Sequence, residues 1–220
     1  VAALLLVVGE ETSHDGARAA NAHSVGSRAL INGEPTESLL AAGTKGAMRV
    51  VVRTEGRAAH SAYPQLGRSA VDALVRLLAE LPALALPSDP VLGETTINVG
   101  VLRGGVADNV IAPAAEARLM ARLVGPAEEV YAILERWAAG RATLERGPTM
   151  PPVRLRTVPG FPTGVVAYAT DIPALTAWGE PFLFGPGSIH VAHTDGEYVG
   201  VGELRSAVDA YVALARRVVG

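Results

Sequence analysis

The feature that most constrains this chain is an apolar run that ends at two adjacent carboxylates. Residues 4–8 are followed by Gly9, Glu10 and Glu11. The run has the length and β-branched content of a buried strand, and ligands in open α/β sheets bind beyond the carboxyl ends of the strands. An exposed helix N-terminus, where the macrodipole favours acidic side chains, is the simpler explanation of this stretch alone. Because neighbouring carboxylates repel each other, a divalent cation beside them is the functional alternative.

A third carboxylate follows the next strand that the sequence predicts. Residues 28–32 form a short apolar segment that ends in Gly33, Glu34 and Pro35. Pro35 fixes a turn and biases Glu34 toward an extended backbone. A lone Gly-Glu-Pro is ordinary turn chemistry, but two strands that both end in carboxylates indicate one acidic site at a sheet edge.

The middle of the chain predicts a separate α+β domain. Apolar and polar side chains alternate over residues 48–53, as in a half-exposed strand, and a helical apolar face follows over residues 69–81. The other predicted elements are strands 95–102 and 115–123, a helix 126–137 and an edge strand 141–144. This strand–helix–strand–strand–helix–strand order is that of a split βαβ, ferredoxin-like unit. We therefore expect residues 44–150 to form an inserted domain.

The segments on either side of the insert are expected to form one α/β domain with an open mixed sheet. This domain consists of residues 1–43 and 151–220. Short apolar segments at residues 165–169 and 182–184 predict two more of its strands, and residues 201–219 predict an amphipathic closing helix.

Composition limits the chemistry that the acidic site can use. The chain has no cysteine, which excludes disulfides and cysteine-bound zinc, so any metal must be held by His, Asp and Glu. The net charge of −3 gives no reason to expect nucleic acid, and no apolar run is long enough to cross a membrane. We expect a cytoplasmic protein. Because Val1 opens a predicted core strand, we also expect further native residues before it.

Five stretches in the right order resemble the M20 family of metallopeptidases and deacylases. They are residues 9–11, 33–36, 59–61, 98–109 and 185–198. The last, Gly-Pro-Gly-Ser-Ile-x-x-Ala-His-Thr-x-x-Glu-Tyr, is most similar to acetylornithine deacetylase. The family also includes succinyl-diaminopimelate desuccinylase, aminoacylase and glutamate carboxypeptidase. Each stretch alone is a weak signal, but five in register imply a zinc-hydrolase domain with an inserted dimerisation or lid domain.

The resemblance implies a hydrolase with two divalent metals, zinc or cobalt. Glu10 would be the general base that takes a proton from a water bridging the metals. Glu11 and Glu34 would each ligate one metal, and His193 would complete a shell. Carboxylate and imidazole ligands suit Zn²⁺, so the resemblance agrees with the chemistry of these residues.

The resemblance also gives roles to residues outside the acidic site. His60 would reach into the site of a partner subunit and stabilise the oxyanion of the reaction, in a homodimer formed through the inserted domain. The substrate-binding positions would be Asn98, Gly104, Gly105 and Gly187. Of the other histidines, His14 and His23 are expected to face solvent, and His190 is expected to be structural or to contact the metal ligands.

The remaining metal ligands of the family lie upstream, in a His-x-Asp motif and an Asp-x-Lys-Gly type motif. Neither motif occurs before Glu10 in this sequence. Glu11, Glu34 and His193 are too few for two catalytic zinc sites, each of which takes about three protein ligands and a water. We therefore predict that this chain alone binds metal weakly or not at all and is inactive.

Three functions remain open. The first is a hydrolase that cleaves the amide bond of an N-acyl amino acid, as a deacetylase or desuccinylase does, with arginines binding the substrate carboxylate. The second is a carboxypeptidase or dipeptidase that acts on short peptides. The third is a non-catalytic dimerisation module, in which strands 48–53 and 117–123 pair edge to edge across a two-fold axis.

Overall fold

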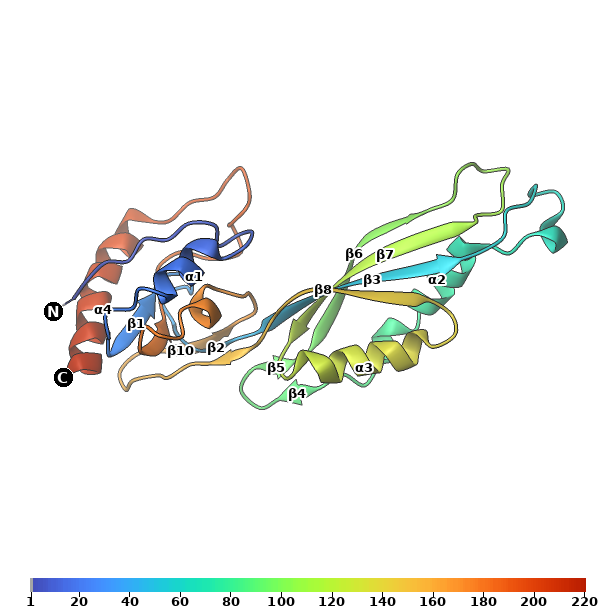
Figure 1. The fold of residues 1–220 in the computed structure, drawn as a ribbon. Helices are drawn as coiled ribbons and strands as arrows, with labels where there is room; N and C mark the ends of the chain where they lie inside the picture. Colours follow the sequence, from blue (N-terminus) through green and yellow to red (C-terminus); the bar gives the residue numbers. More distant parts are fainter. Residues whose placement is uncertain (1) are drawn as a thin grey trace. The chain divides into compact units, whose positions relative to one another are not determined.

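The computed structural model describes residues 2–220, which separate into two compact units (Figure 1). The first unit is formed by Val1–Thr44 and Val153–Gly220, and the second by Lys45–Pro152. The second unit is therefore an insertion in the sequence of the first, with boundaries close to residues 44 and 150.

The second unit is a four-stranded antiparallel sheet with two helices. Its strands are β3 (Gly46–Glu55), β6 (Thr96–Gly104), β7 (Ala114–Leu123) and β8 (Thr143–Met150), in the spatial order β6-β7-β3-β8. Helices α2 (Ala70–Leu78) and α3 (Ala127–Ala138) follow β3 and β7 along the chain. This combination of chain order and sheet order is the split βαβ, ferredoxin-like arrangement, which confirms the predicted fold of the insert.

The connections of the second unit contain short elements. They are the 3-10 helices η1 (Pro64–Leu66) and η2 (Leu81–Ala83) and the strands β4 (Ser88–Asp89) and β5 (Gly93–Glu94). β4 and β5 pair with each other in an antiparallel hairpin, apart from the main sheet.

Burial along β3 alternates as the sequence predicts. Met48, Val50 and Val52 are buried, whereas Arg49 and Arg53 are exposed. The buried face belongs to a core to which the two helices contribute Leu74, Leu77, Val130 and Leu134. Helices α2 and α3 both pack on that face, and the exposed side chains of the opposite face include Arg49, Arg53 and Arg118.

The free edges of this sheet are β6 and β8. β3 pairs with β7 along its whole length and with β8 on its other side, and β7 pairs with β6. The backbone groups of β3 and β7 are therefore used inside the sheet, and the prediction that strands 48–53 and 117–123 pair between subunits was wrong. Alternating burial indicates one buried face, but it does not distinguish an interior strand from an edge strand.

The first unit contains two small sheets. β1 (Ala29–Asn32) pairs in parallel with β11 (Glu180–Leu183). β2 (Leu40–Thr44) pairs in parallel with β10 (Thr163–Val166) and antiparallel with β9 (Val153–Arg154). The unit is therefore mixed α/β with open sheets, as predicted. Both sheets join a strand before the insert to strands after it.

Helices complete the described part of the first unit. They are α1 (Asp15–Asn21), the 3-10 helix η3 (Ile172–Ala174) and the long C-terminal α4 (Val201–Val219). Leu214 of α4 is fully buried with Phe184, and the Tyr211 hydroxyl donates a hydrogen bond to the Phe184 carbonyl at 2.7 Å. Within residues 2–220, no helix has the length and apolar character needed to span a membrane.

The opening segment is extended but joins no sheet. Leu4, Leu6 and Val8 are 84%, 83% and 78% exposed, and no described strand pairs with residues 2–9. A backbone hydrogen bond of 3.1 Å from the Gly16 N–H to the Val8 carbonyl fixes the end of the segment. The prediction of a buried strand over residues 4–8 was therefore wrong. An apolar pattern indicates a tendency toward burial, but a strand also needs a neighbour with which to pair.

Candidate functional site

Glu10 and Glu11 lie on a tight turn between the opening segment and α1. Gly9 begins the turn with a φ of 81°, a left-handed conformation that glycine adopts without strain. Its carbonyl oxygen accepts hydrogen bonds from the backbone N–H groups of Ser13 and His14, at 3.0 and 2.8 Å. These bonds hold the two carboxylates immediately before the start of the helix.

Glu34 lies just beyond the end of β1, where the chain meets the end of β11. The Gly185 carbonyl oxygen accepts hydrogen bonds from the backbone N–H groups of Thr36 and Ser38, at 3.2 and 2.9 Å. A side chain at position 185 would overlap the Glu34 carbonyl oxygen, so this close approach requires glycine. The parallel pairing of β1 with β11 therefore sets the position of the Glu34 backbone.

His193 comes from the loop between β11 and α4. Its backbone is left-handed, with a φ of 61°, which is uncommon for a residue with a Cβ. The His193 backbone N–H donates a hydrogen bond to the Glu197 carboxylate at 3.2 Å. The imidazole Nε2 lies 3.2 Å from Oε1 of Glu11. The loop therefore brings His193 to the turn that carries the two adjacent carboxylates.

The carboxylates of this site act on one another electrostatically. Burial, followed by the negative charges of Glu10, Asp171 and Glu11, raises the pKa of Glu34 to about 7. The pKa of Glu10 is also raised, first by burial and then by the charges of Glu11 and Asp171. Glu10, Glu11, Glu34 and His193 are thus brought together in the first unit, at a place where added positive charge would be stabilising.

The side chains and their spacing fit part of a metal shell. Carboxylate oxygens and imidazole nitrogens are the zinc ligands that remain when cysteine is absent. Two ligand atoms on one tetrahedral zinc ion, each about 2.0 Å from it, lie about 3.3 Å apart. The 3.2 Å between His193 Nε2 and Glu11 Oε1 matches this spacing. No group of three or more His, Asp or Glu side chains within residues 2–220 is arranged to hold a metal ion, so a full shell needs further ligands.

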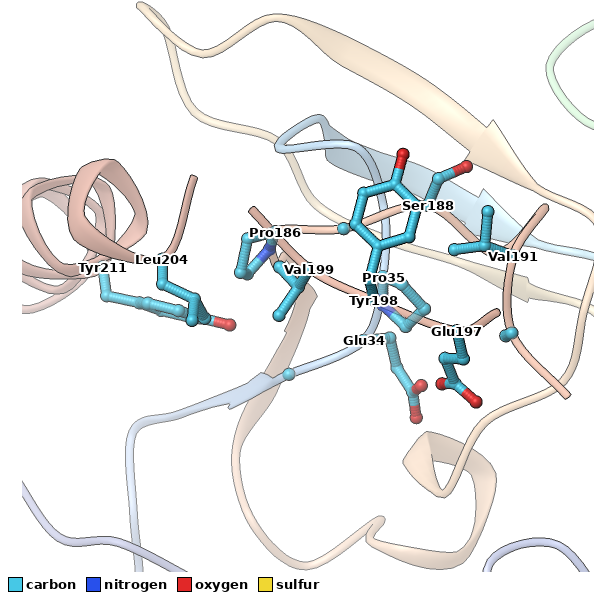
Figure 2. Close-up of a pocket in the computed structure, with 13 residues that line it drawn as sticks. Glu34, Pro35, Pro186, Ser188, Val191, Glu197, Tyr198, Val199, Leu204 and Tyr211 are labelled. Carbon is cyan, nitrogen blue, oxygen red and sulfur yellow. The ribbon is translucent and has the colours of Figure 1, made fainter. Parts of the chain in front are cut away.

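A cavity of ≈ 540 Å³ adjoins Glu34. Figure 2 shows the carboxylates of Glu34 and Glu197 directed toward the same side of it. The apolar and aromatic lining includes Pro35, Pro186, Val191, Tyr198, Val199, Leu204 and Tyr211. A mostly apolar cavity with a few polar groups is the usual form of a small-ligand site. The cavity therefore extends the candidate site from Glu34 toward α4.

Two residues of the site, His14 and Asp171, were not found by the sequence analysis. Nδ1 of His14 donates a hydrogen bond to Oδ1 of Asp171 at 2.8 Å, since an ionised carboxylate only accepts. Their side chains are only 14% and 6% exposed, so the expectation that His14 faces solvent was wrong. Asp171 follows the strand predicted at residues 165–169. The rule that selected Glu34, a carboxylate just beyond a strand, could therefore have found it.

Two predicted site residues, His60 and Asn98, lie in the second unit. His60 is in the loop after β3, with an exposed side chain whose Nδ1 accepts a hydrogen bond from the Ala62 backbone N–H at 3.1 Å. Asn98 is exposed on the edge strand β6. Both side chains are accessible to a ligand or a second subunit, and their roles stay predictions.

The glycines that are predicted to bind substrate occupy positions that favour glycine for different structural reasons. A side chain at Gly104 would overlap Ala115 and Val71, so this glycine is required for packing within the second unit. Gly105 and Gly187 have positive φ values of 78° and 81°. Gly187 lines the cavity beside Glu34, whereas Gly104 is the last residue of β6 and Gly105 follows it. Their contacts with substrate stay predictions.

Comparison with known proteins gives one consistent family. The family model described as peptidase dimerisation domain, M20 type, matches residues 42–143. A probable carboxypeptidase of Aspergillus flavus is 39% identical over 97% of this chain and 58% of its own length. A peptidase M20 domain-containing protein of Schizosaccharomyces pombe is 39% identical over 94% of this chain and 53% of its own length. The chain thus spans about half the length of the curated relatives that it matches.

Solved structures show the same fold at lower identity. An aminopeptidase, PepT, from Bacillus cereus has a TM-score of 0.74 and 19% identity, covering 97% of this chain and 63% of that chain. A tripeptidase from Staphylococcus aureus has a TM-score of 0.63 and 18% identity, covering 82% of this chain and 54% of that chain. At such identities the similarity concerns the fold alone.

Proposed function

Because this chain belongs to the M20 peptidase family, we propose that it forms part of a metal-dependent hydrolase that cleaves a peptide or acyl-amide bond next to a free carboxylate. The convergence of Glu10, Glu11, Glu34 and His193 in the first unit carries the proposal. Since these residues are too few to fill two metal shells, the activity is proposed for the site completed by further ligands.

Each side chain of the site has a distinct role in this proposal. Glu11 and His193 would hold one divalent cation, zinc or cobalt, and Glu34 would hold a second. When bound, such cations polarise the substrate carbonyl and lower the pKa of water. Glu10 takes the proton of the attacking water and gives it to the leaving amine. A carboxylate with a raised pKa is suited to both steps, because it must first accept and then release the proton near neutral pH.

The second unit is proposed to bind substrate and a second copy of the chain. The family model for a peptidase dimerisation domain, which covers most of this unit, supports a homodimer. His60 would stabilise the oxyanion in the site of the partner subunit. Asn98, Gly104 and Gly105 on and after β6, together with Gly187 of the first unit, would contact substrate. Arginine side chains on the face of the sheet opposite α2 and α3 suit a substrate carboxylate.

Two substrate classes are compatible with this chemistry. A carboxypeptidase acting on short peptides is favoured by the names of relatives that are 39% identical to this chain. A deacylase of N-acyl amino acids is the second candidate, favoured by the resemblance of residues 185–198 to acetylornithine deacetylase. In both reactions the bond is cleaved beside a residue that carries a free carboxylate.

A chimera tests the proposal. The segments of the Aspergillus flavus relative that have no counterpart here are joined to residues 1–220, and amine release from dipeptides and N-acetyl amino acids is measured with Zn²⁺ or Co²⁺. We expect hydrolysis that a chelator abolishes. Glu10→Gln should lower kcat by about 10²–10⁴-fold, the contribution of a general base. Glu135→Gln, in an exposed position of α3, is the matched control and should leave kcat unchanged.

The outcomes separate the open functions. A higher kcat/KM on dipeptides identifies the carboxypeptidase, and a higher value on N-acetyl amino acids identifies the deacylase. A folded chimera that binds zinc but releases amine from neither substrate class would contradict the proposal and favour a non-catalytic module.

A further inference from the structure

We propose that His14 and Asp171 are a positioning pair that anchors the turn carrying Glu10 and Glu11. Their importance for catalysis rests on the proposed function. The anchoring itself is a property of the first unit and can be measured without any activity.

Asp171 is the fixed member of the pair. It is 4% exposed and lies between the fully buried Thr170 and the 3-10 helix η3. Its carbonyl oxygen accepts a hydrogen bond of 2.9 Å from the Ala174 backbone N–H. A buried carboxylate is costly unless it is hydrogen-bonded, and the 2.8 Å bond from His14 supplies that partner. Asp171 can therefore hold an incoming donor in one place.

His14 connects three parts of the structure through three different groups. Its backbone N–H closes the turn by donating to the Gly9 carbonyl at 2.8 Å. Its carbonyl oxygen accepts a 3.0 Å hydrogen bond from the Arg18 N–H, which begins α1. Its side chain binds Asp171. The turn, the helix and the segment before η3 therefore meet at one residue.

The backbone of His14 supports a special role for its side chain. Its φ of 56° is left-handed, a conformation that few residues with a Cβ adopt and in which Asn, Asp and His are enriched. His14 stands at the N-cap position of α1, yet its side chain makes no capping hydrogen bond. The contact with Asp171 is thus what the side chain contributes at this position.

The pair lies within electrostatic reach of the candidate catalytic residues. The charge of Asp171 acts on the carboxyl groups of both Glu10 and Glu34. His14 is three residues after Glu11 and acts on Glu10 as well. If the pair were broken, the turn would lose its side-chain hydrogen bond to Asp171, and the remaining bonds from α1 to residues 176–178 lie at the far end of the helix. Glu10 and Glu11 would then be held relative to Glu34 by fewer contacts, among them the 3.2 Å contact of Glu11 with His193.

Hydrogen exchange of the 220-residue chain without metal tests the anchoring. In His14→Ala and Asp171→Ala, we expect the Ser13 N–H and the N–H of residue 14 to exchange at least about tenfold faster, because local opening of the turn costs less. His23→Ala removes a histidine whose Nδ1 contacts the Ala19 carbonyl at 2.9 Å, at the other end of α1, and should change neither rate. Should Asp171→Ala not fold, His14→Ala alone decides the test.

A conservative variant and kinetics of the chimera separate positioning from general stability. Asn tolerates the left-handed backbone and retains an N–H donor, so His14→Asn should restore slow exchange. In the chimera, His14→Ala should lower kcat about tenfold while KM stays within about twofold, as for loss of a transition-state interaction. His14→Asn should recover most of kcat.

Failure of this inference differs from failure of the proposed function. An inactive wild-type chimera would refute the proposed function, and the exchange rates would still decide the anchoring. Unchanged exchange in His14→Ala, or faster exchange spread evenly over the first unit, would overturn the positioning pair. An unchanged kcat in His14→Ala would overturn its importance for catalysis.

Discussion

Glu34 is a carboxyl group that the fold prevents from ionising at its usual pH. Its pKa of about 7 in the folded chain compares with a value of 4.5 without the fold. Between these two values the folded chain keeps a proton that the unfolded chain releases, so the free energy of unfolding decreases as pH rises. In the metal-free protein, we expect the contribution of Glu34 to the free energy of unfolding to fall by about 1–2 kcal/mol from pH 4.5 to 7, after allowance for solvent screening.

Denaturant unfolding of Glu34→Gln checks the sign of this pH dependence. The amide cannot ionise, so the variant should gain stability relative to the wild type as pH rises through the window and show no further gain above it. Glu135→Gln, at an exposed position of the second unit, should follow the wild-type curve. A wild type that gains stability relative to Glu34→Gln as pH rises would contradict the burial of this carboxyl group.

The residues of the site differ in how far the sequence alone could reveal them. Glu10, Glu11 and Glu34 stand where apolar segments end, so a strand-end rule selects them. His193 comes only from the family resemblance, since no local pattern distinguishes it from His190. The contact of His14 with Asp171 joins residues 157 positions apart, and no local pattern contains such a pair.

At the scale of elements, periodicity predicts whether a segment is a helix or a strand and which face it buries. It does not predict which segment lies beside it. The insert could be predicted because each of its strands and helices has one apolar face that the core buries. The same reasoning placed residues 4–8 in a buried strand, although no described strand pairs with them, and it could not show that β3 and β7 are interior strands. Pairing depends on neighbours that are distant in the sequence.

The close contact between the end of β11 and Glu34 makes a second prediction. Gly185→Ala places a methyl group against the Glu34 carbonyl oxygen and should destabilise the first unit by about 1–3 kcal/mol, the usual cost of overpacking. In Gly202→Ala, the added methyl group meets nothing within 4 Å. Because alanine is the better helix former, this control in α4 should be stabilised by up to about 1 kcal/mol.

The two tryptophans allow this effect to be assigned to one unit. Trp178 belongs to the first unit and Trp137 to the second. In urea unfolding followed by fluorescence, Gly185→Ala should lower the midpoint in a Trp137→Phe background, where Trp178 reports. It should leave the midpoint unchanged in a Trp178→Phe background. A shift seen only by Trp137, or by neither tryptophan, would show that Gly185 is not needed for the approach of β11 to Glu34.

At the scale of the whole molecule, the exposed edge of the second unit is a candidate surface for the proposed dimer. The outer edge of β6 has backbone groups that no described strand pairs, and Val99 and Leu102 on this strand are 40% and 53% exposed. Leu102 and Val71 of α2 line a shallow hollow of ≈ 230 Å³. An apolar strand edge beside a helix is a surface that pairing with a second copy would cover.

We therefore predict that the chain is a dimer through β6 and α2, and that Leu102→Asp dissociates it. A buried aspartate at such an interface should cost about 2 kcal/mol or more, which raises the dimer Kd at least about thirtyfold. Sedimentation equilibrium measures this constant. Leu4→Asp, at a position 84% exposed in the first unit, is the control and should leave Kd unchanged.

A wild type that stays monomeric, or a Leu102→Asp variant that dimerises as tightly as the wild type, would contradict a dimer through β6 and α2. Because His60 is proposed to act on the partner subunit's site, the same variant in the chimera should lose hydrolysis at concentrations where the dimer dissociates.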